Sequence, residues 1–100
     1  MIDVTAKDLA LVQQILHGHC QAAKIWVFGS RAKGTAKRGS DLDLAIDAGA
    51  ALPASVKARL AASFEDAPLP YTVDLVDLAT VSPEFRALID AHKLPFPGFE

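Results

Sequence analysis

The segment 41–47 reads DLDLAID, and its alternation of acidic and apolar residues constrains the fold more than any other feature of the chain. Successive side chains of a β-strand point to opposite faces, so one face of this segment is apolar and the other is acidic. The apolar face consists of Leu42, Leu44 and Ile46, and the acidic face carries Asp41, Asp43 and Asp47. The pattern predicts a strand whose sheet is buried on one side and holds carboxylates on the other.

Turn residues and helix-capping signals divide the rest of the chain into short elements. The spacing of apolar residues predicts helices over 6–17, 53–66 and 82–92. β-Branched or alternating residues predict two further strands, over 24–28 and 71–77. Residues 30–40 carry glycines and cations without an apolar period beyond alanines, so they predict a loop with room for one helical turn at its start.

The length of 100 residues predicts a single domain with one core, spanning residues 1–100. Residues 94–100 are expected to form an irregular tail. Its Leu94, Phe96 and Phe99 are too apolar to stay in water as a group, so we expect them to pack on the domain or on a partner.

Composition excludes several classes of function. The net charge of -2 argues against direct binding of nucleic acid, which normally requires a basic excess on one face. A single cysteine, Cys20, rules out an internal disulfide, and no apolar run approaches the roughly 20 residues that span a bilayer. The N-terminus also lacks a basic start followed by an apolar stretch, so we expect a cytoplasmic protein with no membrane contact.

The paired acids Asp41 and Asp43 predict a metal site. Residues at i and i+2 on one strand face lie about 6.5 to 7 Å apart, and like charges at that distance repel. Mg²⁺ prefers oxygen ligands, is usually held by one or two carboxylates, and completes its octahedron with water and substrate phosphates. The alternative is a solvated polar face on an exposed strand.

Gly29 and Ser30, which follow the strand predicted over 24–28, favour a bound phosphate. A glycine lets the backbone approach a ligand closely, and the serine hydroxyl and nearby N–H groups donate to phosphate oxygens. Arg31 is the first of four cations in the next nine residues and is our first candidate to neutralise the phosphates. A P-loop is excluded, because Thr35 stands where its lysine must be.

The residues Gly29-Ser30, ten further residues and Asp41-Leu42-Asp43 resemble the G-S-x10-D-x-D signature of DNA polymerase β-like nucleotidyltransferases. The sequence GSRAKGTAKRGSDLDL is similar to that of members of their minimal branch, and the resemblance covers nearly the whole chain. It implies an α+β fold, a small mixed sheet with helices on one face and the active site on the other. It also implies a third metal ligand and catalytic aspartate on a later strand, here Asp74.

The resemblance further implies that a nucleoside monophosphate, AMP from ATP, moves to an acceptor hydroxyl with release of pyrophosphate. Two Mg²⁺ ions would be held by Asp41, Asp43 and Asp74, and Asp74 would take the hydroxyl proton. Minimal members are typically paired with a helical HEPN protein in toxin–antitoxin systems, so the partner would be a HEPN toxin that is silenced by adenylylation. Two alternatives remain: a catalytically silent module that covers its partner, and a transferase acting on a small molecule.

Parity favours Asp74 over Asp77 as the third ligand. In the segment 71–77, Asp74 shares a face with Thr72 and Val76, whereas Asp77 shares the face of Val73 and Leu75. If those two apolar residues face the helices, Asp74 faces the open side with Asp43. The alternative is that both acids are polar residues at a strand end.

Overall fold

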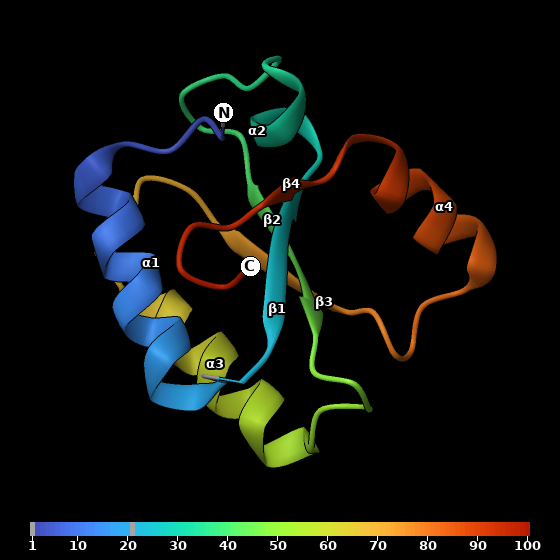
Figure 1. Ribbon diagram of the computed structural model, residues 1–100. Coiled ribbons are helices and arrows are strands. Elements are labelled where there is room, and N and C mark those ends of the chain that lie inside the picture. Colours follow the sequence, from blue (N-terminus) through green and yellow to red (C-terminus); the bar gives the residue numbers. More distant parts are fainter. Residues whose placement is uncertain (1, 21) are drawn as a thin grey trace.

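A four-stranded mixed sheet forms the centre of the computed structural model, which describes residues 2–20 and 22–100 (Figure 1). The strand order is β3-β2-β1-β4. β1 is antiparallel to both β2 and β4, whereas β2 and β3 are parallel. In chain order, the elements are α1 (Ala6–His19), β1 (Lys24–Phe28), α2 (Ser30–Lys33), β2 (Leu42–Asp47), α3 (Ala54–Asp66), β3 (Val73–Asp77), α4 (Pro83–His92) and β4 (Leu94–Pro95).

The helices begin at the capping residues that the sequence indicates. Thr5 Oγ1 accepts a hydrogen bond from the Asp8 N–H at the start of α1, and Ser82 Oγ accepts one from the Phe85 N–H at the start of α4, each over 3.2 Å. These bonds satisfy amides that have no partner within the helix. α1 ends two residues later than predicted, because Gly18 keeps a helical conformation.

The main core lies between the sheet and the two helices α1 and α3, which Figure 1 shows on the same side of it. Val12 and Leu16 of α1 and Leu60 of α3 are fully buried against the apolar face of the strands. The buried sheet residues are Ile25, Val27, Leu42, Leu44 and Ile46. This apolar face is the one predicted from the alternation in segment 41–47.

The second face of the sheet is covered in part by α4. Ile89 of this helix packs with Ala45 and Leu78, and the half-buried Trp26 and Phe28 border the cluster. The predicted α+β fold with a mixed sheet is therefore confirmed, and α4 is an addition on the face that carries the acids. It leaves uncovered the end of that face where β2 begins (Figure 1).

The tail begins with a strand and returns to the core. Phe96 is completely buried and Phe99 is 4% exposed. The Phe96 N–H donates to the Ile25 carbonyl at 2.9 Å, and the Ile25 N–H donates to the Phe99 carbonyl at 3.1 Å. The tail is thus held on β1 by backbone bonds as well as by its aromatic rings. It is more ordered than the predicted irregular segment, because burying two aromatic side chains offsets the cost of ordering it.

Within the described ranges, every helix is too short or too polar to cross a membrane.

Candidate active site

Asp43 and Asp74 lie side by side on neighbouring strands. They are register partners in the parallel pair β2–β3, where adjacent strands lie about 4.8 Å apart. Both side chains point to the face that α4 covers in part, because their strand neighbours Ala45 and Val76 belong to the cluster under α4. Asp41 immediately precedes β2 and is exposed. The sheet therefore brings all three predicted acids to one end of one face.

These carboxylates have no cationic partner to neutralise them. Burial raises the pKa of Asp43 to about 6, and the charges of Asp74 and Asp41 act in the same direction. Among residues 2–20 and 22–100, no ion pair involves any of the three. Repulsion of this kind costs folding free energy, so the arrangement favours a cation or a phosphate-bound metal at this position.

Gly29 fixes the distance between the end of β1 and Asp43. Its φ of +70° lies in the left-handed region, which favours glycine. A Cβ atom at this position would collide with the Asp43 carboxylate. The turn that carries Ser30 is thus packed directly against the acid, and any other residue at position 29 would adopt a strained backbone and displace the Asp43 carboxylate.

Arg31 has a different place from the one predicted for it. Its side chain is buried, and its nitrogens donate to the carbonyl oxygens of Ser40 (2.8 Å) and Asp3 (2.8 Å), with further bonds to the loop at residues 37 and 38. The guanidinium also stacks on the Tyr71 ring, 4.0 Å from its centre. Every guanidinium nitrogen therefore donates to a backbone carbonyl, so Arg31 organises the loop and is not available as predicted to neutralise phosphates.

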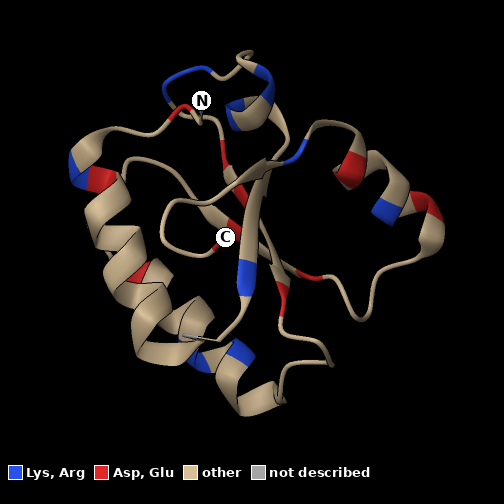
Figure 2. Ribbon diagram, viewed as in Figure 1, with Lys and Arg blue, Asp and Glu red and all other residues tan. Residues whose placement is uncertain are grey.

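The basic loop, defined as residues 30–40, presents its other cations to solvent. Lys33, Lys37 and Arg38 are all exposed. Figure 2 shows these basic positions gathered at the end of the sheet where β2 begins, next to the acidic start of that strand. The sequence offered no signal to separate Arg31 from these three, because its acceptors are backbone carbonyls, one of them 28 residues away in the chain.

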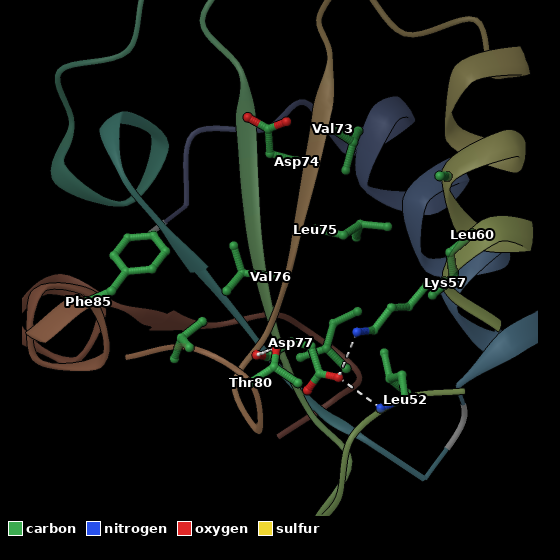
Figure 3. A pocket seen from close by; sticks show the side chains of 13 residues that line it. Leu52, Lys57, Leu60, Val73, Asp74, Leu75, Val76, Asp77, Thr80 and Phe85 are labelled. Carbon is green, nitrogen blue, oxygen red and sulfur yellow. Dashed lines mark hydrogen bonds and ion pairs between the residues drawn. The ribbon is translucent and has the colours of Figure 1, made fainter. Parts of the chain in front are cut away.

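Asp77 lies on the opposite face of β3 and is fully engaged. Its carboxylate accepts hydrogen bonds from the N–H groups of Leu52 (2.8 Å) and Ala79 (3.0 Å), and it pairs with Lys57 at 3.5 Å (Figure 3). Burial alone would raise its pKa, but these contacts together hold the pKa of Asp77 below its ordinary value. Asp77 thus ties the β2–α3 connection to the end of β3.

The structure shows which metal-ligating side chains lie together and which are used in packing. Within the described part of the chain, no three His, Cys, Asp or Glu side chains lie close enough together to hold a metal ion as they stand. His17 stacks on Phe99 with ring centres 4.5 Å apart, and His19 hydrogen-bonds Ser63 at 3.3 Å. His17 and His19 are thus used in packing, whereas no ion pair among the described residues involves Asp43 or Asp74.

The sequence and the fold were compared with known proteins. Residues 11–94 match the family described as "Polymerase beta, Nucleotidyltransferase". The chain is 43% identical over 88 residues to the probable protein adenylyltransferase MntA of Haemophilus influenzae. The aligned residues cover 88% of this chain and 77% of that protein.

Two solved structures have the same fold. One is the crystal structure of a toxin–antitoxin with AMP-PNP, with a TM-score of 0.74, 27% identity and coverage of 89% of this chain and 72% of that chain. The other is a mutant of the toxin–antitoxin MntA–HpeT, with a TM-score of 0.72, 25% identity and coverage of 88% and 71%.

A mixed sheet with paired acids at one end and a glycine-serine turn packed against them is the arrangement expected of a nucleotidyltransferase domain. The chain belongs to the polymerase β nucleotidyltransferase family, and it is a nucleotidyltransferase.

Proposed function

We propose that this chain transfers AMP from ATP to a hydroxyl group of a partner protein, that the reaction depends on Mg²⁺, and that the partner is a helical HEPN-type toxin silenced by the transfer. The chain would then act as the antitoxin. Its similarity to a probable protein adenylyltransferase, and to a toxin–antitoxin with AMP-PNP, supports the choice of donor and of acceptor class.

The observation that carries this proposal is the close packing of Gly29 against Asp43. It joins the two halves of the site, because the turn suited to phosphate and the acid suited to a metal occupy one place. In the proposed complex, Gly29 and Ser30 contact the triphosphate. The exposed cations of the basic loop neutralise the charge that remains on it.

The donor set fits magnesium. Mg²⁺ is usually held by one or two carboxylates together with water and phosphate oxygens, so Asp43 and Asp74, with Asp41 close by, are sufficient. Burial raises the pKa of Asp43, and the like charges of Asp74 and Asp41 raise it further, so a bound cation would favour the charged carboxylate. When bound, Mg²⁺, as one or two ions, would supply charge neutralisation at the α-phosphate and at the leaving group.

The transfer itself exchanges one phosphorus–oxygen bond for another. The acceptor oxygen forms a bond to the α-phosphorus, the bond to the oxygen bridging the α- and β-phosphates breaks, and pyrophosphate leaves with that oxygen. The hydroxyl proton passes to Asp74, whose exposed carboxylate lies on the outer strand of the site. Asp43 and Asp41 would hold the Mg²⁺, which would supply the positive charge that keeps the phosphate chain in place.

The direct test uses ATP labelled on its α-phosphate, Mg²⁺ and the protein encoded next to this chain. We expect label to appear on that protein with the wild type and to be lost when Asp41 and Asp43 are both replaced by Asn. The fold of this double variant should be as stable as the wild type or slightly more so, because two repelling charges are removed. Asp47→Asn, at the other end of β2, is the matched control and should transfer normally.

Three other outcomes would overturn the proposal. A double variant that still transfers AMP would mean that the acids are not the site. A wild-type protein that binds its partner without labelling it would be the catalytically silent module. Label found only on a small molecule would identify a different acceptor class.

A further inference from the structure

The outer edge of β3 is open. This strand lies at the end of the sheet, and within residues 2–20 and 22–100 only β2 pairs with it. Two bonds fix which backbone groups face β2: the Leu42 N–H donates to the Thr72 carbonyl and the Leu78 N–H donates to the Ile46 carbonyl, both over 2.9 Å. Thr72 and Leu78 share their parity with Asp74, so these residues turn their backbone groups inward.

The alternate residues of β3 turn their backbone groups outward. These are Val73, Leu75 and Asp77. The Asp77 carbonyl is taken by the N–H and hydroxyl of Thr80, at 3.0 and 3.1 Å. Three N–H groups and two carbonyls therefore remain along the edge, with the spacing that an added strand would meet. The five residues Val73–Asp77 include no proline or glycine that would block such pairing.

A groove of about 560 Å³ follows this edge. Leu60 and Ala61 of α3 form one wall, and Val81 and Phe85 form the other. Figure 3 shows Leu60 and Phe85 on either side of β3, with Asp74 toward one end of the groove. Phe85 is 40% exposed, so this wall is open to solvent. Most residues that line the groove are apolar, and Asp74 is among the polar ones.

We propose that the acceptor protein binds in this groove as an extended segment that adds a fifth strand to β3. This inference rests on the proposed function and names the shape of its substrate. An added strand would satisfy the outward N–H and carbonyl groups of β3, which is the recognition that strand addition provides. A nucleotide is a poorer occupant, because the one cation that lines the groove, Lys57, is paired with Asp77.

The geometry also predicts a pattern in the acceptor. Directly opposed residues on paired strands have Cβ atoms about 4.5 to 5.5 Å apart, so a residue paired beside Asp74 brings its hydroxyl to that carboxylate. Its two chain neighbours then point to the other face, toward Leu60 and Ala61. The acceptor segment should therefore carry a serine, threonine or tyrosine between two apolar residues.

A pair of adjacent alanines on α3 supplies the test. Ala61 and Ala62 are both exposed, but only Ala61 lines the groove. In the complete protein with its encoded partner, Ala61→Trp should reduce AMP transfer at least tenfold, and Ala62→Trp should leave it unchanged. Binding of a fluorescent ATP analogue with Mg²⁺, and the melting temperature, should be the same for both variants and the wild type.

Each other result has a distinct meaning. Equal transfer by the two variants overturns the groove and leaves the proposed function standing. If Ala61→Trp loses nucleotide binding as well, the groove holds the nucleotide and the inference is wrong. A wild-type protein that labels no partner defeats the proposed function and the inference together.

Amide hydrogen exchange tests the strand pairing itself. On binding the partner, the N–H groups of Val73, Leu75 and Asp77 should exchange at least tenfold more slowly than in the free protein. Unchanged exchange in the complex would overturn strand addition. Slow exchange that appears with rising concentration of this chain alone, together with a dimer in light scattering, would assign the edge to a second copy instead.

Discussion

Asp74 and Asp77 lie three residues apart on β3, but the two faces of the sheet use them in opposite ways. Asp77 sits beneath α3 and receives two backbone N–H groups and a lysine, so its charge is compensated and holds two segments together. Asp74 is exposed beside Asp43, and within the described residues neither has an ion-pair partner.

The contrast separates a charge that stabilises the fold from charges that we propose bind a metal ion. A buried carboxylate with satisfied oxygens adds stability, whereas neighbouring acids without a cation reduce it. Packing on the face covered by α1 and α3 supplies the free energy of folding that offsets the repulsion between the acids on the second face. Substitutions on the first face should therefore act on stability, and substitutions on the second should act on transfer.

The largest loss of stability is expected for Phe96→Ala. Phe96 is completely buried, and removing its ring from the core should lower the free energy of unfolding by about 3 to 5 kcal/mol. Phe85→Ala is the matched change on the other face, where the ring is 40% exposed and makes an edge contact with Phe28, so we expect a smaller loss of about 1 kcal/mol. Urea unfolding measures both, and similar losses would contradict the division between the faces.

Gly29→Ala should affect both properties at once. The added Cβ meets the Asp43 carboxylate in a backbone conformation that disfavours alanine, so we expect a loss of about 1 to 3 kcal/mol and a fall in AMP transfer of at least about tenfold. Gly39→Ala is the control, because nothing lies within 4 Å of its Cβ position and it lacks a positive φ. Normal transfer by Gly29→Ala would show that this contact is not needed.

The smallest expected effect is the pH dependence of the stability that Asp77 contributes. The pKa of Asp77 is lower in the folded protein than its ordinary value of 3.8, so its contribution to stability is present above that pH and is lost as the pH falls through the folded value. Asp77→Asn should cost about 1 to 2 kcal/mol at pH 7, and the difference from wild type should shrink below about pH 4. Asp47→Asn should produce little change at either pH, and a difference for Asp77→Asn that stays constant as the pH is lowered from 7 to the point of acid unfolding would contradict this role.

Patterns within single elements predicted most of the fold. The alternation in 41–47 placed Leu42, Leu44 and Ile46 in the core, and β1 has the predicted bounds. The sequence did not indicate β4, because a two-residue strand containing proline has no period of its own and forms only when Phe96 and Phe99 are buried beside it.

The family was predictable to a similar degree, whereas the roles of the site residues stay predictions. The order of Gly29, Ser30, Asp41, Asp43 and Asp74 along the chain was sufficient to name a family that the comparisons confirm. The structural role of Arg31 was not predictable, since it depends on carbonyl groups that only folding brings together. The open edge of β3 was equally hidden, because strand order is set by tertiary packing and not by any local pattern.

The most direct test of this account compares Asp74→Asn with Asp77→Asn in one transfer assay and one melting experiment. We predict that Asp74→Asn lowers AMP transfer at least about 100-fold, because we propose that its carboxylate takes the acceptor proton. The melting temperature should stay the same or rise slightly, because a charge that repels Asp43 is removed and no ion pair among the described residues is lost. Asp77→Asn should lower the melting temperature while folded molecules still transfer AMP at close to the wild-type rate. Equal, mild effects of the two changes, or a loss of transfer confined to Asp77→Asn, would contradict the assignment of the two faces.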